Sequence, residues 1–291
     1  MGCTLCPRAC GVDRQNKLGT CHAPDDMIVS RIAPHFYEEP VISGTRGSGT
    51  VFFSGCSLGC LFCQNAAISR RAVGETISEE ALAERLLALA DTGVHNLNLV
   101  TATHYTHRVA RVLERIKHRL TIPVVWNSSG YESPLTLRLL EGLVDIYLPD
   151  LKYHSPALAK AYSGVEDYPT VAREALLEMH RQVGAVKFDG SGLLSRGLVV
   201  RHLVLPGHRE DSLAVLDDLA ATLPISDIRL SLMRQYTPDF APEWAPKNLR
   251  RRLTSFEYDT VVKKALSLGF EGFLQQGDAA DKKFTPDFRQ E

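Results

Sequence analysis

Residues 50–65 read TVFFSGCSLGCLFCQN. The apolar run TVFF predicts a buried strand, and a loop rich in glycine and cysteine follows it directly. Gly55 and Gly59 allow the backbone of this loop to wrap closely around a bound group, and Phe62 offers that group a flat apolar surface. We therefore expect a binding loop at the carboxyl end of a strand.

Cys56, Cys60 and Cys63 of this loop have the spacing C-x3-C-x2-C. Three thiolates can hold three irons of a 4Fe–4S cluster and leave the fourth iron without a protein ligand. An open coordination position lets a metal bind a reactant directly, as in catalytic zinc sites. The spacing therefore indicates a cluster that takes part in catalysis, with these three cysteines as its ligands.

Strand patterns alternate with helix patterns from this loop onward. The predicted strands cover residues 50–53, 96–100, 123–126, 145–148, 198–205, 228–232 and, as a short addition, 272–274. Such alternation predicts a parallel sheet with helices outside it. Six strand–helix units are fewer than the eight of a complete TIM barrel. We therefore predict an α/β fold, a partial (β/α)6 TIM-like barrel, with a doubly wound sheet as the alternative.

The chain is expected to divide near residue 50. Residues 1–49 carry Gly, Pro, Asn and Asp at short intervals, which predicts a loop-rich, cysteine-containing N-terminal extension. Residues 50–291 form the predicted barrel, whose chemistry should lie at the carboxyl ends of its strands. Polar residues recur at successive strand ends, and they are Asn127, Ser128, Asp150, Lys152 and Arg201.

The composition is that of an ordinary globular protein, with 44% hydrophobic residues, 23% charged residues and a net charge of −1. A nucleic-acid-binding chain normally carries a basic excess, so we expect no nucleic-acid partner. No apolar run reaches the roughly 18 residues of a membrane span, and the first ten residues lack the apolar core of a signal peptide. We expect a cytoplasmic protein without a membrane partner.

All seven cysteines lie within the first 63 residues. In a large cytosolic chain, clustered cysteines point to metal binding or redox chemistry. Cys3, Cys6, Cys10 and Cys21 have the spacing C-x2-C-x3-C-x10-C. Four thiolates can close a tetrahedral zinc site or hold a second iron–sulfur cluster, and ligand softness alone does not choose between them. A reduced loop held by packing alone is the remaining alternative.

The loop with Cys56, Cys60 and Cys63 resembles that of the radical S-adenosylmethionine (SAM) superfamily, in which an aromatic residue precedes the third cysteine. The resemblance implies that the amino and carboxylate groups of SAM chelate the open iron. It also implies reductive cleavage of SAM to a 5′-deoxyadenosyl radical, which abstracts hydrogen from a substrate. The cofactor performs this chemistry, and the protein positions it and excludes water and oxygen.

Several later segments are similar to the activating enzymes of pyruvate formate-lyase, especially their PflX-type relatives. The segments are VWNSSGY (125–131), LPDLK (148–152), RHLVLPG (201–207) and LMRQY (232–236). The resemblance implies that Asn127 and Ser128 approach the ribose and methionine parts of SAM, and that Asp150 and Lys152 lie beside it. Asp150 suits the positive groups of SAM, and Lys152 or Arg201 suits its carboxylate.

One segment departs from the family pattern. Many relatives carry Gly-Gly-Glu after the second barrel strand, where this chain has TATHYTH over residues 101–107. The hydroxyls of Thr101 and Thr103 are candidates to replace the missing carboxylate. His104 is either a site residue or a helix-start residue.

These features support three functions. The first is an activase that takes hydrogen from a glycine of a partner glycyl radical enzyme. The second is a radical SAM enzyme that modifies a peptide or a small molecule. The third is an iron–sulfur or zinc protein for electron transfer or sensing, which would not cleave SAM. For the first two, the resemblance implies flavodoxin or ferredoxin as the external electron donor.

Overall fold

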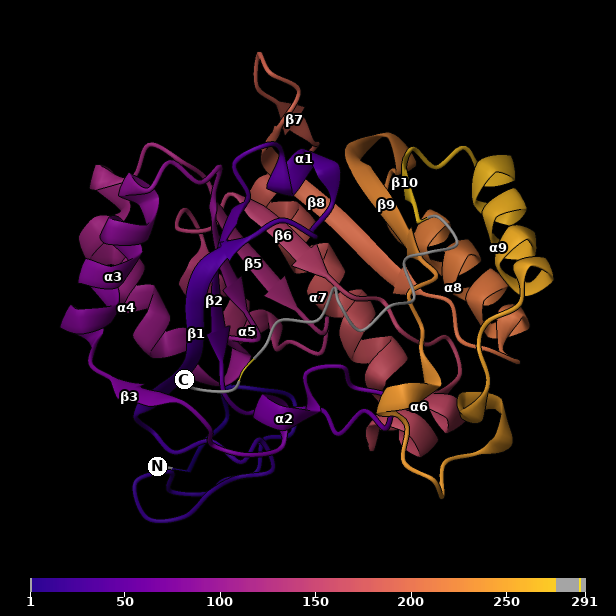
Figure 1. Cartoon of the computed structure of the whole chain (residues 1–291), viewed down its shortest axis with the longest axis horizontal. Helices are drawn as coiled ribbons and strands as arrows, with labels where there is room; N and C mark the ends of the chain where they lie inside the picture. Colours follow the sequence, from indigo (N-terminus) through magenta and orange to yellow (C-terminus); the bar gives the residue numbers. More distant parts are fainter. Residues whose placement is uncertain (1, 276–287, 289–291) are drawn as a thin grey trace.

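One large sheet organises the chain (Figure 1). The computed structural model describes residues 2–275 and Phe288, and its strand order is β10-β9-β8-β6-β5-β4-β2-β1-β3, with β7 paired to β8. The strands are β1 (Met27–His35), β2 (Ser48–Phe53), β3 (Glu75–Ile77), β4 (Leu97–Val100), β5 (Val124–Ser128), β6 (Ile146–Pro149), β7 (Lys187–Phe188), β8 (Leu194–Leu203), β9 (Ile228–Met233) and β10 (Gly272–Leu274).

The main part of this sheet is parallel. Neighbouring strands from β2 through β4, β5, β6, β8 and β9 to β10 all run in the same direction, and β1 is antiparallel to β2 and β3. The predicted α/β class with a mostly parallel sheet is confirmed, including the short strand at 272–274. Closure of the sheet into a partial barrel stays a prediction.

Helices follow the parallel strands as the alternating pattern predicts. They are α1 (Pro40–Ser43), α2 (Ala66–Ser69), α3 (Glu79–Asp91), α4 (Thr106–Ile116), α5 (Pro134–Leu137), α6 (Pro156–Ser163), α7 (Tyr168–Val183), α8 (Arg209–Thr222) and α9 (Ser255–Leu268). The α3 helix begins after Ser78, whose hydroxyl accepts the Ala81 N–H at 3.1 Å. This bond satisfies one of the free amides of the first turn, as expected for an N-cap.

The expectation of a loop-rich segment over residues 1–49 is wrong for residues 27–35. They form β1, which pairs with β2 over most of its length. The apolar residues at the start of β1 are buried, since Met27 is 1% exposed and Val29 is 4% exposed. Strand β1 therefore belongs to the same sheet as the predicted barrel strands, whereas residues 2–26 contain no helix or strand.

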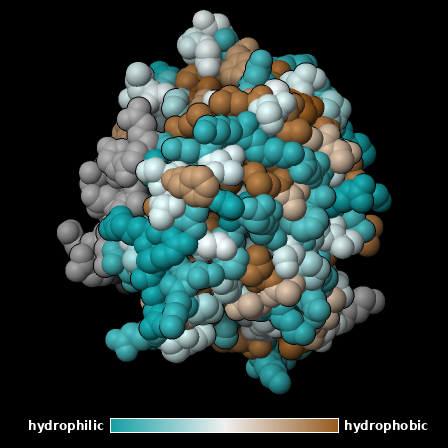
Figure 2. Space-filling model, turned by 90° about the vertical axis from the view of Figure 1, so that its right-hand side faces the viewer, coloured by the Kyte–Doolittle hydropathy of each residue, from teal (hydrophilic) through white to brown (hydrophobic). Residues whose placement is uncertain are grey.

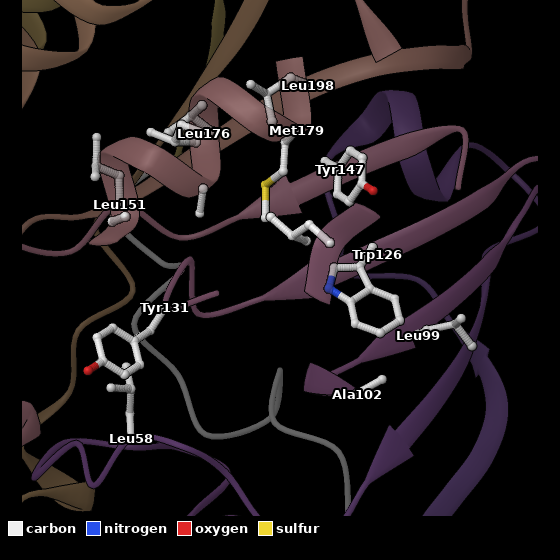
Figure 3. Packing of buried hydrophobic residues seen from close by; sticks show 14 of the residues in the cluster. Leu58, Leu99, Ala102, Trp126, Tyr131, Tyr147, Leu151, Leu176, Met179 and Leu198 are labelled. Carbon is white, nitrogen blue, oxygen red and sulfur yellow. The ribbon is translucent and has the colours of Figure 1, made fainter. Parts of the chain in front are cut away.

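The core lies between the sheet and the helices that cover it. Figure 3 shows Trp126 of β5, Tyr147 of β6 and Met179 of α7 among these buried side chains, and each is 0% exposed. Burial of side chains of this size stabilises the fold by about 1.5–3 kcal/mol each. Packing on one side of the sheet thereby fixes the strands whose ends carry the predicted site.

The face on which α9 lies carries hydrophilic residues interspersed with hydrophobic ones (Figure 2). Within the described part of the chain, no helix combines the length and the apolar character needed to cross a membrane.

Candidate active site

A cavity of about 180 Å³ lies at the carboxyl ends of the parallel strands. Its lining includes the predicted cluster ligands and the residues predicted beside them and at the ends of the later strands: Cys56, Cys60, Phe62, Cys63, Asn127, Ser128, Asp150, Lys152 and Arg201. These residues come from the ends of β2, β5, β6 and β8, which are neighbours or near neighbours in the parallel sheet. The structure therefore brings residues separated by up to 145 positions into one site.

The cysteine loop is fixed by the backbone of the N-terminal segment. The Cys56 N–H donates to the Cys21 carbonyl at 3.1 Å. Gly55 has a φ of +89°, and a Cβ at this position would lie 2.6 Å from the same carbonyl oxygen. Only glycine combines this left-handed conformation with so close an approach. The first glycine of the loop is therefore required by its contact with Cys21.

The three cysteine sulfurs face the cavity in a setting that suits iron. The Leu58 N–H lies 3.4 Å from Cys56 Sγ, and Cys60 Sγ lies 2.9 Å from the Ser163 hydroxyl. Burial raises the pKa of the Cys56 and Cys60 thiols, so their thiolates need a cationic partner. Three thiols around one cavity, with no fourth cysteine among its lining residues, fit a 4Fe–4S cluster with one open iron.

A buried network of charges lines the same cavity as the cysteines. Lys152 Nζ lies 2.6 Å from Asp150 Oδ2, and Arg201 Nε lies 3.0 Å from Asp150 Oδ1. Arg201 also donates to Asn127 Oδ1 at 2.6 Å. Burial opposes ionisation of Asp150, but the two cations hold its pKa below the ordinary value. Asp150 is therefore a carboxylate at neutral pH, and it orients both basic side chains that line the cavity.

The turns after β5 and β6 are tied together by one tyrosine. The Tyr168 hydroxyl lies 2.8 Å from the carbonyl oxygens of both Ser129 and Asp150. Gly130 has a φ of +74°, and a Cβ there would lie 2.2 Å from the Asp150 carbonyl oxygen. The close packing of these turns sets the distance between the predicted ribose-binding segment and Asp150.

A second cavity of about 470 Å³ adjoins the first, and both are lined by Asn127 and Arg201. It contains two acidic residues that sequence reasoning missed. Glu38 accepts hydrogen bonds from Asn127 at 3.2 Å and from Arg201 at 3.3 Å. Glu39 is 8% exposed, and its Oε2 has no hydrogen-bond partner among the described residues. The sequence signal for them is the apolar start of β1, since residues 38 and 39 follow that strand.

The segment that departs from the family pattern has two different roles. Thr101 lines the first cavity and has a φ of +60°, an uncommon conformation for a β-branched residue. Thr103 faces away from the cavity lining and donates to Glu132 at 2.6 Å. His104 is 1% exposed, and its Nε2 lies 2.7 Å from the Ser54 carbonyl oxygen. Burial lowers the pKa of His104 to about 3, so the neutral ring supports the start of the cysteine loop.

Glu132 gives a prediction on pH dependence. It is fully buried, and burial raises its pKa from 4.5 to about 7. Between these values the folded protein holds a proton that the unfolded chain has lost, so stability falls as the pH rises through this window. Gln at this position cannot ionise. We expect Glu132→Gln to gain about 2.5 kcal/mol in free energy of unfolding relative to the wild type between pH 5 and pH 8.

Denaturant unfolding of the apoprotein at both pH values measures this difference. The exposed residue Glu166, whose side chain is 63% exposed, provides the control variant Glu166→Gln. A difference between wild type and Glu132→Gln that stays constant from pH 5 to pH 8 contradicts the expectation.

The four N-terminal cysteines lie close to one another. A Cβ on Gly19 would be 3.0 Å from Cys10 Sγ and 3.9 Å from Cys21 Sγ. Burial raises the pKa of Cys6 to about 11, and the nearby Cys21 and Cys3 sulfurs add to the shift. Among residues 2–275 and 288, no three or more His, Cys, Asp or Glu side chains form a group that could hold one metal ion.

Comparison with known protein families matches residues 50–220 to the Radical SAM superfamily. The match covers more than half of the chain and includes the cysteine loop, the two strand-end turns and Arg201. The chain belongs to the radical SAM superfamily, and it is therefore a member of a family of enzymes that use a 4Fe–4S cluster and SAM.

The chain is also similar to individual proteins. The chain is 28% identical over 274 residues to the uncharacterized protein MJ0674 of Methanocaldococcus jannaschii, and the match covers 91% of this chain and 73% of that protein. It is similar to the structure of Streptococcus suis SuiB bound to the precursor peptide SuiA, with a TM-score of 0.52 and 11% identity. That match covers 77% of this chain and 47% of SuiB.

The structure of SuiB bound to S-adenosylmethionine gives a similar match, with a TM-score of 0.51 and 12% identity over 77% of this chain. This chain spans about half the length of SuiB, at 49%. At such identity the likeness concerns the fold alone.

Proposed function

We propose that this protein cleaves SAM reductively in the cavity lined by Cys56, Cys60 and Cys63, and that the resulting radical abstracts hydrogen from a substrate in the adjoining cavity. The observation that carries the proposal is the convergence of three thiols and the Asp150 network on one cavity. When bound, the cluster and SAM supply an electron and a 5′-deoxyadenosyl radical. Family membership makes this chemistry the expected one, and the residue assignments are our proposal.

The residues of the chain hold and orient SAM. Cys56, Cys60 and Cys63 would hold three irons of the cluster, and the fourth iron would stay open to the amino and carboxylate groups of SAM. Lys152 and Arg201, already held by Asp150, supply positive charge for that carboxylate. Asn127 and Ser128 offer hydrogen-bond donors and acceptors to the ribose, and Phe62 provides an apolar surface that keeps water from the reacting atoms.

The substrate is proposed to enter the second cavity. The two cavities share Gln64, Asn65, Val100 and Met233 in addition to the residues named above, so a group in the second can approach SAM in the first. The buried, unpartnered Glu39 Oε2 favours a substrate group that donates a hydrogen bond or carries positive charge. This favours a small molecule or a peptide side chain as the substrate.

The activase function stays a second candidate, and its support is the resemblance of LPDLK and the other strand-end segments to activating enzymes. It predicts a glycyl radical enzyme as partner and hydrogen abstraction from a glycine backbone. A flavodoxin or ferredoxin is the proposed electron donor for either substrate class, and a cytoplasmic location is proposed from the same resemblance and the reduced state that clustered thiols require.

Anaerobic turnover tests the proposed function. We expect the protein, reconstituted with iron and sulfide and reduced with dithionite, to convert SAM to 5′-deoxyadenosine and methionine. Omission of dithionite is the control. A loaded, reducible cluster that leaves SAM intact contradicts the proposal and favours an electron-transfer or sensor protein.

A further inference from the structure

The four N-terminal cysteines form a compact group outside the catalytic cavity. A Cβ on Gly19 would lie 3.0 Å from Cys10 Sγ and 3.9 Å from Cys21 Sγ. Backbone hydrogen bonds of 2.9 Å join Cys3 to Val12 and Ala9 to Cys6, on either side of Cys10. Cys6 and Cys21 are 8% and 6% exposed, whereas Cys3 and Cys10 are partly exposed. These contacts draw the four cysteines together, and four thiols are the number of ligands that a closed metal centre takes.

The backbone beside two of these cysteines adopts a conformation that is costly for its residues. In the described part of the chain, the non-glycine residues with positive φ are Ala9, His22 and Thr101, at +39°, +56° and +60°. Ala9 precedes Cys10 and His22 follows Cys21. Such strain persists only where the surroundings impose it, and it concentrates at functional sites. Thr101 lines the catalytic cavity, and the other two residues, Ala9 and His22, each adjoin an N-terminal cysteine.

The spacing of these cysteines favours a cluster over zinc. Closed zinc sites commonly take their ligands as two close pairs, each ligand about 2.0–2.3 Å from one ion. Here three cysteines fall within residues 3–10 and the fourth stands alone at position 21, as in iron–sulfur sequences with closely spaced runs.

The group is in direct contact with the catalytic loop. The Cys21 carbonyl accepts a hydrogen bond from the Cys56 N–H at 3.1 Å. A residue of the N-terminal cysteine group is therefore bonded directly to a residue of the catalytic cysteine group. Arg8, between Cys6 and Cys10, donates to the Ser57 carbonyl at 2.9 Å and to the Gly164 carbonyl at 2.9 Å. Two independent connections therefore couple the N-terminal group to the residues around Cys56.

We propose that Cys3, Cys6, Cys10 and Cys21 bind a second 4Fe–4S cluster, which adjoins the catalytic cluster through the Cys21–Cys56 hydrogen bond. The adjacency of two clusters rests on the proposed function of Cys56, Cys60 and Cys63, whereas the existence of the N-terminal cluster does not. Four protein thiolates leave no open iron, so this cluster binds no SAM.

Iron and sulfide analysis of three full-length proteins tests the site. We expect about eight irons per chain in the reconstituted wild type, about four in the Cys56→Ala/Cys60→Ala/Cys63→Ala variant, and about four in a Cys3→Ser/Cys6→Ser/Cys10→Ser variant. The first of these variants leaves the N-terminal ligands intact, so the proposal is tested even when the second variant fails to fold. Zinc is measured in the same samples.

The outcomes separate this proposal from the proposed function. About four irons and four sulfides in the Cys56→Ala/Cys60→Ala/Cys63→Ala variant establish the N-terminal cluster. No iron in this variant, or one zinc per chain, overturns it. A folded Cys3→Ser/Cys6→Ser/Cys10→Ser variant without iron would contradict cluster binding by Cys56, Cys60 and Cys63. That result would not contradict the N-terminal cluster. The adjacency of the clusters is tested by electron paramagnetic resonance of the reduced proteins. A wild-type spectrum broader than the summed spectra of the two variants supports the adjacency, and a wild-type spectrum equal to that sum contradicts it.

Discussion

Replacement of Cys56, Cys60 or Cys63 by Ala should abolish the formation of 5′-deoxyadenosine. Each sulfur lines the same cavity, and each is expected to bind a different iron of the cluster. Residues that only support a metal ligand already change metal affinity or activity by about 10–100-fold when mutated. The loss of a direct ligand should therefore exceed about 100-fold, measured as the rate of 5′-deoxyadenosine formation under anaerobic conditions.

Two serines provide a graded control for this experiment. The Ser163 hydroxyl lies 2.9 Å from Cys60 Sγ, so Ser163→Ala should reduce activity by about 10–100-fold while the cluster still assembles. Ser57 lies in the same loop but has no thiol to bind iron. Ser57→Ala should therefore retain the cluster. Wild-type rates in all three cysteine variants would refute the assignment of the site.

The second large effect is expected at Asp150. Asp150→Asn keeps the shape of the side chain but removes the negative charge that Lys152 and Arg201 share. The side chains of the two cations are only 15% and 14% exposed, so they would be left poorly compensated in a buried setting. Removal of one partner from a buried charge network typically destabilises a protein by about 3–5 kcal/mol.

We expect this loss in the free energy of unfolding of Asp150→Asn, together with weakened SAM binding, because Lys152 and Arg201 lose the group that orients them. Anaerobic denaturant unfolding and a SAM titration of the reconstituted protein measure the two effects. Glu166→Gln is the matched control, because it removes one charge of an exposed ion pair. The side chains of this pair, Lys160 and Glu166, are 67% and 63% exposed. Exposed pairs contribute only about 0–1 kcal/mol, so equal stabilities of the two variants would contradict the role given to Asp150.

Local sequence patterns accounted for the parallel strands and for the cysteine loop. Apolar runs separated by helical periods predicted where the parallel strands lie along the chain, because strand and helix periodicities are properties of neighbouring residues. The same reasoning missed β1. Its apolar start, MIVS, changes to a mixed pattern with Arg31 and His35, so it gave no sustained period within a segment rich in turn residues.

The residues that face the site from a distance were decided by the tertiary structure. Glu38 meets Asn127 across 89 positions and Arg201 across 163 positions, and no local pattern connects them. The role of His104 was also decided by the tertiary structure. The sequence left two roles open, and the contact of His104 with the Ser54 carbonyl shows that it supports the cysteine loop.

The sequence by itself determined the strand–helix alternation, the cluster-type spacing of Cys56, Cys60 and Cys63, and the polar residues at successive strand ends. These depend on short-range order, and the parallel sheet then gathers strand ends at one edge. Only the tertiary structure decided that Glu38 and Glu39 line the second cavity and that Cys21 contacts Cys56. Such contacts depend on how the sheet packs against the N-terminal segment, which is a property of the whole chain and not of any short stretch within it.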